Sequence, residues 1–573
     1  MSRTRSALLT LAALSVVSCS PMQWSGAADR EVYGLLREKE ETLFGEAADF
    51  DIETPHSAED PSEIAAIDIF TERHQRDTRK IDLVAAIGIS VDRRREYQAE
   101  KENLYLAGLE LTSARHDFSP IFSGGSTGEL SSAGIDGDET SRQLTMRTRA
   151  GFSQLLKSGG TVAIGLAQNI FRYYLGGSGG PSTEFFSANL TQPLLRGAGP
   201  SATENLTQSE RDVAYAIRSF SRFQKRNALD VTSAYFRILE EKDRVRNEYF
   251  NYRNLIAFTE RATALAEDRL PQFQVDQAKQ DELRARNRYV GEVSTYRTRI
   301  DDFKLTLGLP VGGDLFVDDA ALRDLEKTGL TPLPLDEEAA LALATRHRLD
   351  LLNEIDQFED SQRRMTVAAE ALKPGLNLFA GLSLDSPGGR TYSNFDAEVY
   401  RSRIGIDLDL PLDNVPERNA YRRTRIAFER QLRELGLALD RIQSDIRAGF
   451  RGLSLARERY EIQQSALQLA NQRVEAVNLL LDTDRAETRD LLEARNAQLS
   501  ARNALTSALI DYHLTRLELL FDLGVFDPDK DRFWAENPAI PQVPRNNGEG
   551  SDVGEPGRGS LISPEELFQE PST

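Results

Sequence analysis

Two segments of the chain alternate strictly between apolar and polar or small residues. Between Pro374 and Pro411 the apolar positions recur at every second residue, and a period of two with one apolar face predicts strands that are wetted on one side. The residues of this face are Leu376, Leu378, Ala380, Leu382, Leu384, Ile404, Ile406, Leu408 and Leu410. Phe186, Ala188 and Leu190 repeat the pattern before Pro193. We therefore expect strands over 116–193 and 374–411.

The first strand block is about twice as long as the second. This extra length leaves room for an additional hairpin, whose turn we expect at Ser158-Gly159-Gly160. The glycine-rich run at 176–180 and the segment 387–389 read as loop tips.

After each strand block the apolar period becomes helical. Stripes spaced three and four residues apart run without proline and predict long coiled-coil-like hairpins over 201–307 and 416–523. At 1.5 Å per residue each outgoing helix is ~100 Å long, and each returning helix is about half of that. We expect composite columns, in which 335–372 completes 274–307 and 81–115 completes 485–523. The irregular segments would then form a belt at mid-height.

Self-similarity divides the chain into two tandem copies of one unit. IDLVAAI at 81–87 aligns with LDEEAAL at 335–341, and SAYFRIL at 233–239 aligns with RAGFRGL at 447–453. Because such matches occur in the same order, they indicate a repeat. We place the first repeat at 81–332 and the second at 333–526, each holding a helix, strands and a long helical hairpin.

Composition excludes several classes of protein. The net charge of −20 argues against a dominant nucleic-acid surface. One cysteine allows no intrachain disulfide, and the five histidines are scattered singly. No carboxylate pair and no phosphate-binding glycine loop stands out, so we expect no catalysis, no cofactor and no metal site.

The first residues are typical of a secretory signal. Arg3 and Arg5 precede a short apolar run, and Cys19 follows a small residue at the position where a bacterial lipoprotein signal is cleaved. We expect a signal peptide over 1–18 and lipidation at Cys19, although an ordinary cleaved signal with a chance cysteine is the alternative. An acidic segment over 19–80 and a flexible acidic tail over 527–573 flank the repeats.

Four segments resemble the TolC-like outer-membrane efflux proteins. They are SANLTQPLLRG at 187–197, VDQAKQDELRARN at 275–287, LDEEAALALATRHRLDLLNEIDQFEDSQ at 335–362 and TDRAETRDLLEARNAQ at 483–498. The resemblance covers about 80–526. It implies a mainly α fold with a membrane β-barrel: a homotrimer with a twelve-strand barrel in the bacterial outer membrane and a coiled-coil helical barrel extending into the periplasm. It also implies two partners, a periplasmic adaptor and an inner-membrane pump.

The same resemblance assigns candidate functional residues. Adaptor contact is expected at the hairpin tips, through Arg269, Leu270, Gln274, Val275, Leu491 and Leu492. Repeated threefold, Asp482, Asp484 and Asp490 would form acidic rings at the periplasmic aperture, with Arg485 and Arg489 as their partners. The alternative interpretation of both sets of residues is an ordinary solvent-exposed helical turn with no binding role. The strand-to-helix junctions are expected at Pro193, Gly197 and Pro411.

Two functions remain open at this point. One is a passive duct, the outer-membrane component of a tripartite efflux or type I secretion system, anchored in the outer membrane by its acyl chain. The other is a structural coiled-coil tether of the envelope, in which the strands only cap a rod.

Overall fold

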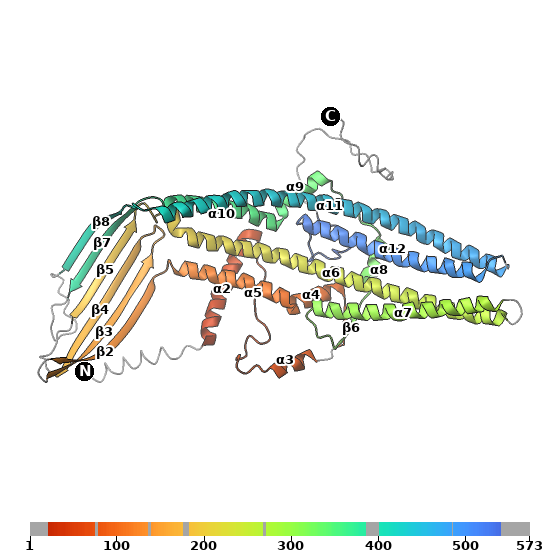
Figure 1. Cartoon of the computed structure of the whole chain (residues 1–573), viewed down its shortest axis with the longest axis horizontal. Coiled ribbons are helices and arrows are strands. Elements are labelled where there is room, and N and C mark those ends of the chain that lie inside the picture. Colours follow the sequence, from red (N-terminus) through yellow and green to blue (C-terminus); the bar gives the residue numbers. More distant parts are fainter. Residues whose placement is uncertain are drawn as a thin grey trace, which may run out of the picture.

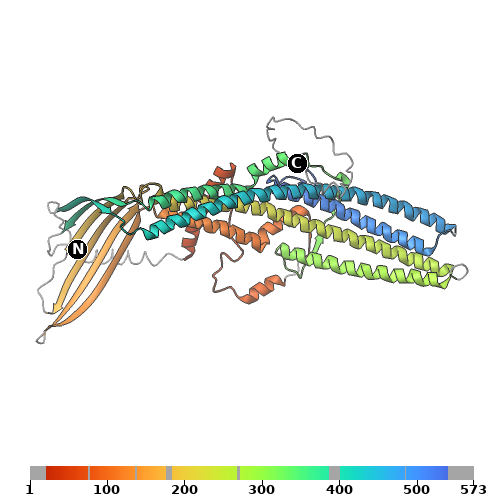
Figure 2. The same cartoon turned by 45° about the horizontal axis from the view of Figure 1, so that its top comes forward.

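The computed structural model describes residues 21–74, 78–135, 139–175, 183–266, 271–385, 400–483 and 485–539. The chain is an elongated rod with a β-sheet at one end and two helical hairpin tips at the other (Figures 1 and 2). Among the described residues, no helix combines the length and the apolar character needed to cross a membrane.

The sheet has six antiparallel strands in the order β2-β3-β4-β5-β7-β8. They are β2 Ile121–Ile135, β3 Glu139–Leu155, β4 Thr161–Leu175, β5 Thr183–Pro193, β7 Gly375–Asp385 and β8 Tyr400–Asp409. The additional hairpin predicted from the length of the first block is present. Its turn lies between β3 and β4, where Gly159 has φ +88°. The described part of the chain thus contributes six strands to this sheet, which corrects the count of four that a twelve-strand trimer requires. The tips expected at 176–180 and 387–389 lie outside the described residues.

Four helical columns run side by side along the rod. The long helices are α6 Pro200–Leu265 and α11 Val415–Asp482. In the half away from the sheet, α7 Gln272–Thr306 packs on α6, and α12 Thr488–Asp522 lies between α6 and α11. In the half near the sheet, α5 Arg95–His116 packs on α6, and α10 Leu349–Glu370 lies between α6 and α11. The edges of this wall are therefore α11 on one side and α7 with α5 on the other.

The short helices are stacked within one repeat, which corrects the expected exchange between repeats. Gly308 closes the C-terminal end of α7, where its N–H donates to Leu305 O at 3.0 Å, while Leu309 N–H donates to Lys304 O at 2.8 Å. This is a Schellman cap, which requires a left-handed residue, and Gly308 has φ +73°. A Cβ on Gly308 would lie 2.0 Å from the carbonyl oxygen of Arg93, just before α5. Column α7–α5 is thus continuous along α6.

The second repeat contains the same junction. Gly524 has φ +76° after α12, and a Cβ there would lie 2.6 Å from the carbonyl oxygen of His347, at the end of α9 Glu337–His347. The equivalent helix in the first repeat is α4 Leu83–Arg93. The N-caps match as well, because the carboxylates of Asp82 and Asp336 each accept a backbone N–H at 2.8 Å.

A belt surrounds the columns at mid-height. Strand β1 Thr78–Ile81 pairs in parallel with β6 Asp314–Val317, next to α8 Ala320–Thr328. Residues of the belt and of α6, α7 and α12 share one apolar core. Residues 527–539 belong to this belt, since Phe533 is 5% exposed and Ala535 is fully buried. For this part of the tail, the expectation of flexibility is wrong.

The acidic N-terminal segment is partly helical. Helix α2 Pro21–Phe44 packs through Val32, Leu35 and Leu36 on α5 and α6, and α3 Ala66–Arg73 leads toward the belt. The few apolar residues of α2 fall on one face, so the helix is amphipathic. This helix was missed at the sequence level because only the charge of the segment was considered.

Candidate functional site

One face of the sheet is apolar across all six strands. Strand register aligns Phe122 with Phe152, and Phe152 with Ile164, so these side chains share a face. Phe122 and Ile404 are 79% and 80% exposed, although they belong to regular strands. Other exposed apolar or aromatic side chains on this face include Leu130, Met146, Leu166, Leu190, Leu382, Tyr400, Ile406 and Leu408. No described element packs on this apolar face, and an apolar face of this extent suits contact with lipid or another chain.

The sheet also has two open edges. Within the described residues, β2 pairs only with β3, and β8 pairs only with β7. Unpaired backbone groups along such an edge are ready to pair with another strand.

The predicted junction residues lie where the strands meet the helices. Pro193 is the last residue of β5, opposite Asn377, and the next residue, Leu194, donates its N–H to Leu376 O at 2.7 Å. Gly197 has φ +83° in the turn before α6, a conformation that favours glycine. Pro411 follows β8 by two positions. At the same level Arg196 forms an ion pair with Asp409 at 2.9 Å.

A buried polar network joins the two repeats in the helical wall. Asp360 on α10 is 1% exposed and accepts hydrogen bonds from Tyr215 at 2.7 Å, from Arg363 at 2.9 Å and from Arg211. Burial alone would raise the pKa of Asp360, but these hydrogen bonds hold it below its usual range. The network fixes α10 against α6 at one register.

The expected adaptor residues are split between the core and the surface. Val275, Leu491 and Leu492 are buried, and Leu492 packs with Leu255 of α6. In this chain they hold the hairpins together, which corrects the expectation that they form the contact surface. Gln274 is half-buried, with its N–H donating to Pro271 O at 3.0 Å. Arg269 and Leu270 lie outside the described residues.

Exposed apolar residues near the tips were missed by the sequence reasoning. Phe273, two residues into α7, is 66% exposed, and Leu479 near the end of α11 is 65% exposed. Periodicity is the signal for Phe273, which falls outside the apolar stripe that buries the neighbouring Val275 in its own hairpin. Leu479 belongs to the other hairpin, near the end of α11.

The aperture residues lie around the α11–α12 turn. Asp482 is the last residue of α11, and Asp490 accepts the N–H of Glu487 at 3.0 Å at the start of α12. Arg485 and Arg489 are exposed, and neither forms an ion pair with Asp490 in the described part of this single chain. Asp484 and Cys19 lie outside the described residues.

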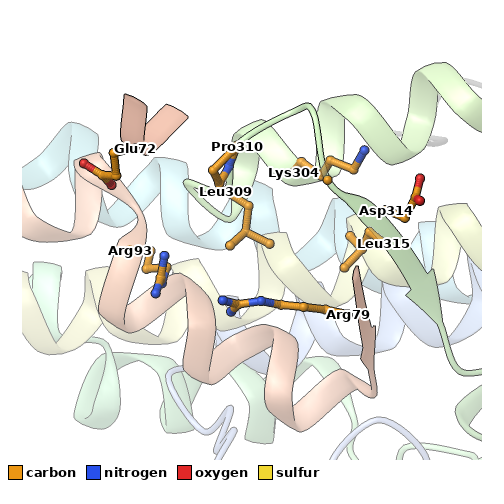
Figure 3. Close-up of a pocket in the computed structure, with 9 residues that line it drawn as sticks. Glu72, Arg79, Arg93, Lys304, Leu309, Pro310, Asp314 and Leu315 are labelled. Carbon is orange, nitrogen blue, oxygen red and sulfur yellow. The ribbon is translucent and has the colours of Figure 1, made fainter. Parts of the chain in front are cut away.

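A small charged pocket lies in the belt (Figure 3). Arg79, Arg93 and Lys304 surround it together with Glu72 and Asp314, over an apolar floor that includes Leu309 and Leu315. Lys304 is already bound to Asp301 and to the carbonyl of Val311, each at 3.0 Å. The pocket therefore reads as part of the joint between belt and column. No cluster of three or more metal-ligating side chains occurs among the described residues.

Comparisons with known proteins bear on the fold. No protein-family model and no curated protein matches the chain. Solved structures do match, including the CmeC outer-membrane channel of Campylobacter jejuni, at a TM-score of 0.56 and 13% identity over 80% of this chain and 90% of that one. The outer-membrane protein VceC of Vibrio cholerae matches at 0.55 and 13%, over 77% and 96%. The open MtrE outer-membrane channel of Neisseria gonorrhoeae matches at 0.57 and 13%, over 77% and 89%. The chain therefore has the fold of the TolC-like outer-membrane channels, as the four sequence segments suggested.

Proposed function

We propose that the protein is the outer-membrane channel of a tripartite efflux or type I secretion system, working as a passive homotrimeric duct. The observation that carries this proposal is the six-stranded sheet, which combines an exposed apolar face with two open edges. A membrane-spanning sheet has to satisfy every backbone group, and only a closed barrel does so. Three copies joined β8 to β2 would close a barrel of eighteen strands.

The helical wall supports the same assembly. In the half of the rod away from the sheet, α11 and α7 form the two edges of the helical wall. Leu455, Ile462 and Leu469 on α11 are exposed and spaced seven residues apart, and Leu283 and Val290 on α7 are spaced likewise. A heptad spacing is the pattern of coiled-coil seams. When copies join in a ring, α11 of one copy meets α7 of the next, and these stripes bury each other.

The remaining sites take their roles from this assembly. The tips that carry Asp482, Asp484 and Asp490 would form the periplasmic aperture, and the adaptor and pump would dock around them. Phe273, Leu479 and Leu480 are exposed apolar side chains near these tips. Acyl chains on Cys19 would add an anchor in the outer membrane.

The first experiment measures mass and conductance. The full chain is purified in detergent, its mass is determined by light scattering, and it is inserted into planar bilayers. We expect a trimer and discrete ion-conducting steps. Ile462→Asp together with Leu469→Asp places charges in the seam and should shift the protein to monomers. Gln464→Asp, an exposed position on the opposite face of α11, is the matched control and should leave the trimer intact.

Two outcomes would contradict the proposal. A monomer that conducts no ions, even with Asp482 and Asp490 replaced by asparagine, would favour the alternative of a structural envelope tether. A trimer that survives the double aspartate variant would show that the copies join along other surfaces.

A further inference from the structure

Four arginines occupy the polar face of the sheet. Strand register places Arg147 opposite Thr127 and Arg149 opposite Gly125 on β2, in alternation with the apolar side chains of β3. Arg401 and Arg403 on β8 likewise alternate with Ile404 and Ile406. Because successive side chains of a strand point to opposite faces, all four arginines face away from the apolar surface. In the proposed barrel, on which this inference rests, they face the lumen.

The four arginines lie at one height. Arg149 precedes the last residue of β3 by six positions, and Arg403 precedes the last residue of β8 by the same six. Arg147 and Arg401 each precede those ends by eight positions. Both strands end at the level where the sheet meets the helices (Figure 1). At a rise of ~3.3 Å and a tilt of about 40°, the arginines lie about 15–20 Å into the barrel.

Closure of the barrel brings these residues together at each seam. In the closed barrel, β8 of one copy would pair with β2 of the next copy, and β3 of that next copy would follow. Arg401 and Arg403 on β8 would therefore stand two strands, about 10 Å, from Arg147 and Arg149 on β3 of the next copy. The inward residues of β2 at this level are Ser123, Gly125 and Thr127, which leave space between the guanidinium groups.

Three of the four arginines form no ion pair within the described part of the chain. Among the described residues, no carboxylate forms an ion pair with Arg147, Arg149 or Arg403, and all three side chains are exposed. On the same face, Asp407 and Asp409 lie nearer the helices, and Asp409 pairs with Arg196. Glu129 lies farther out on β2, opposite Thr145. The arginines thus form a band between acidic residues on either side, in a chain that carries −20 overall.

We propose that this arginine band is a binding site for multivalent oxyanions inside the barrel. Three copies supply twelve guanidinium groups in three clusters, each with two arginines from one chain and two from its neighbour. Guanidinium groups bind sulfate, phosphate and carboxylate groups with paired hydrogen bonds, and charged residues lining a pore set its ion selectivity. Polymers carrying such groups would be held in the exit of the duct, whereas neutral polymers would pass it.

Polymer block of the conducting channel tests the site. Dextran sulfate and neutral dextran of equal length are added to the reconstituted full-length protein. Dextran sulfate should block the current, and the variant with Arg147, Arg149, Arg401 and Arg403 all changed to glutamine should need at least tenfold more of it for half block. The control changes Arg418, Arg422, Arg423 and Arg425 to glutamine, which removes the same charge from exposed positions at the start of α11. That control should keep the block of the unmodified channel.

The outcomes separate this inference from the proposed function. If the unmodified protein conducts no current, the channel itself is wrong. If it conducts and both quadruple variants are blocked like the unmodified protein, or lose the block equally, the arginine band is not the site. Unchanged conductance of the variants with neutral dextran shows that they have folded and inserted.

Discussion

The junction inside each composite column gives the sharpest test of the fold. Replacing Gly308 with alanine places a methyl group where a left-handed residue faces the carbonyl oxygen of Arg93. The added Cβ would lie 2.0 Å from that oxygen, and 2.6 Å from its carbon. Both are backbone atoms at the end of α4, just before α5, so no side-chain rotation relieves the contact.

Two costs add at this position. A non-glycine residue in the left-handed conformation costs about 1–2 kcal/mol. Overpacking against atoms that are held in place costs a further 1–3 kcal/mol or so. We therefore expect Gly308→Ala to lower the free energy of unfolding by about 3 kcal/mol. Gly524→Ala, in the same place in the second repeat, should behave alike.

Two other glycines separate the contributions. Gly45 follows α2 with φ +81° and has no atom within 4 Å of an added Cβ, so Gly45→Ala carries the conformational cost alone. Gly312 has open space and an ordinary φ, so Gly312→Ala should be near neutral. Urea midpoints of the detergent-solubilised variants, compared at a common slope, measure these differences. If Gly308→Ala and Gly45→Ala shift the midpoint equally, the stacking of α7 on α5 tolerates a side chain, and our account of the column is wrong.

Three further predictions concern buried groups. Asp360→Asn should destabilise the protein by about 1–3 kcal/mol, because an amide cannot accept all the hydrogen bonds that Tyr215, Arg211 and Arg363 donate to the buried carboxylate. Glu359→Gln, on an exposed pair, should cost less than about 1 kcal/mol in the same urea series. Burial lowers the pKa of His513 to about 4. The unfolded chain binds this proton below pH ~6.5, so stability should fall by up to about 3 kcal/mol between pH 6.5 and 4, and His513→Gln should flatten that part of the profile. Phe533→Ala should cost about 3–5 kcal/mol in thermal or urea unfolding, while the exposed Asp531→Ala should cost almost nothing.

The sequence predicted where the strands and helices lie better than it predicted which elements pack against each other. Alternation located the strands because one face of each is apolar and the other polar, and block length revealed the extra hairpin. Helical period located α6 and α11. These signals are local, so they survive without knowledge of what lies opposite. The N-terminal helix was missed because its apolar stripe, Val32, Leu35 and Leu36, is short within a charged segment.

Column pairing and tip surface were wrong for one shared reason. Length alone matches α7 equally well with α5 or α10, and only the contact of Gly308 with Arg93 decides for α5. Likewise Val275 and Leu492 lie at the tips, but antiparallel packing of each hairpin turns them inward and leaves Phe273 exposed. Which face of a helix remains free depends on its partners in space. The sequence signal that bears on this is a second apolar stripe beyond the one the hairpin buries. The heptad of Leu455, Ile462 and Leu469 is such a stripe, and it is the reason to expect a neighbouring copy along α11.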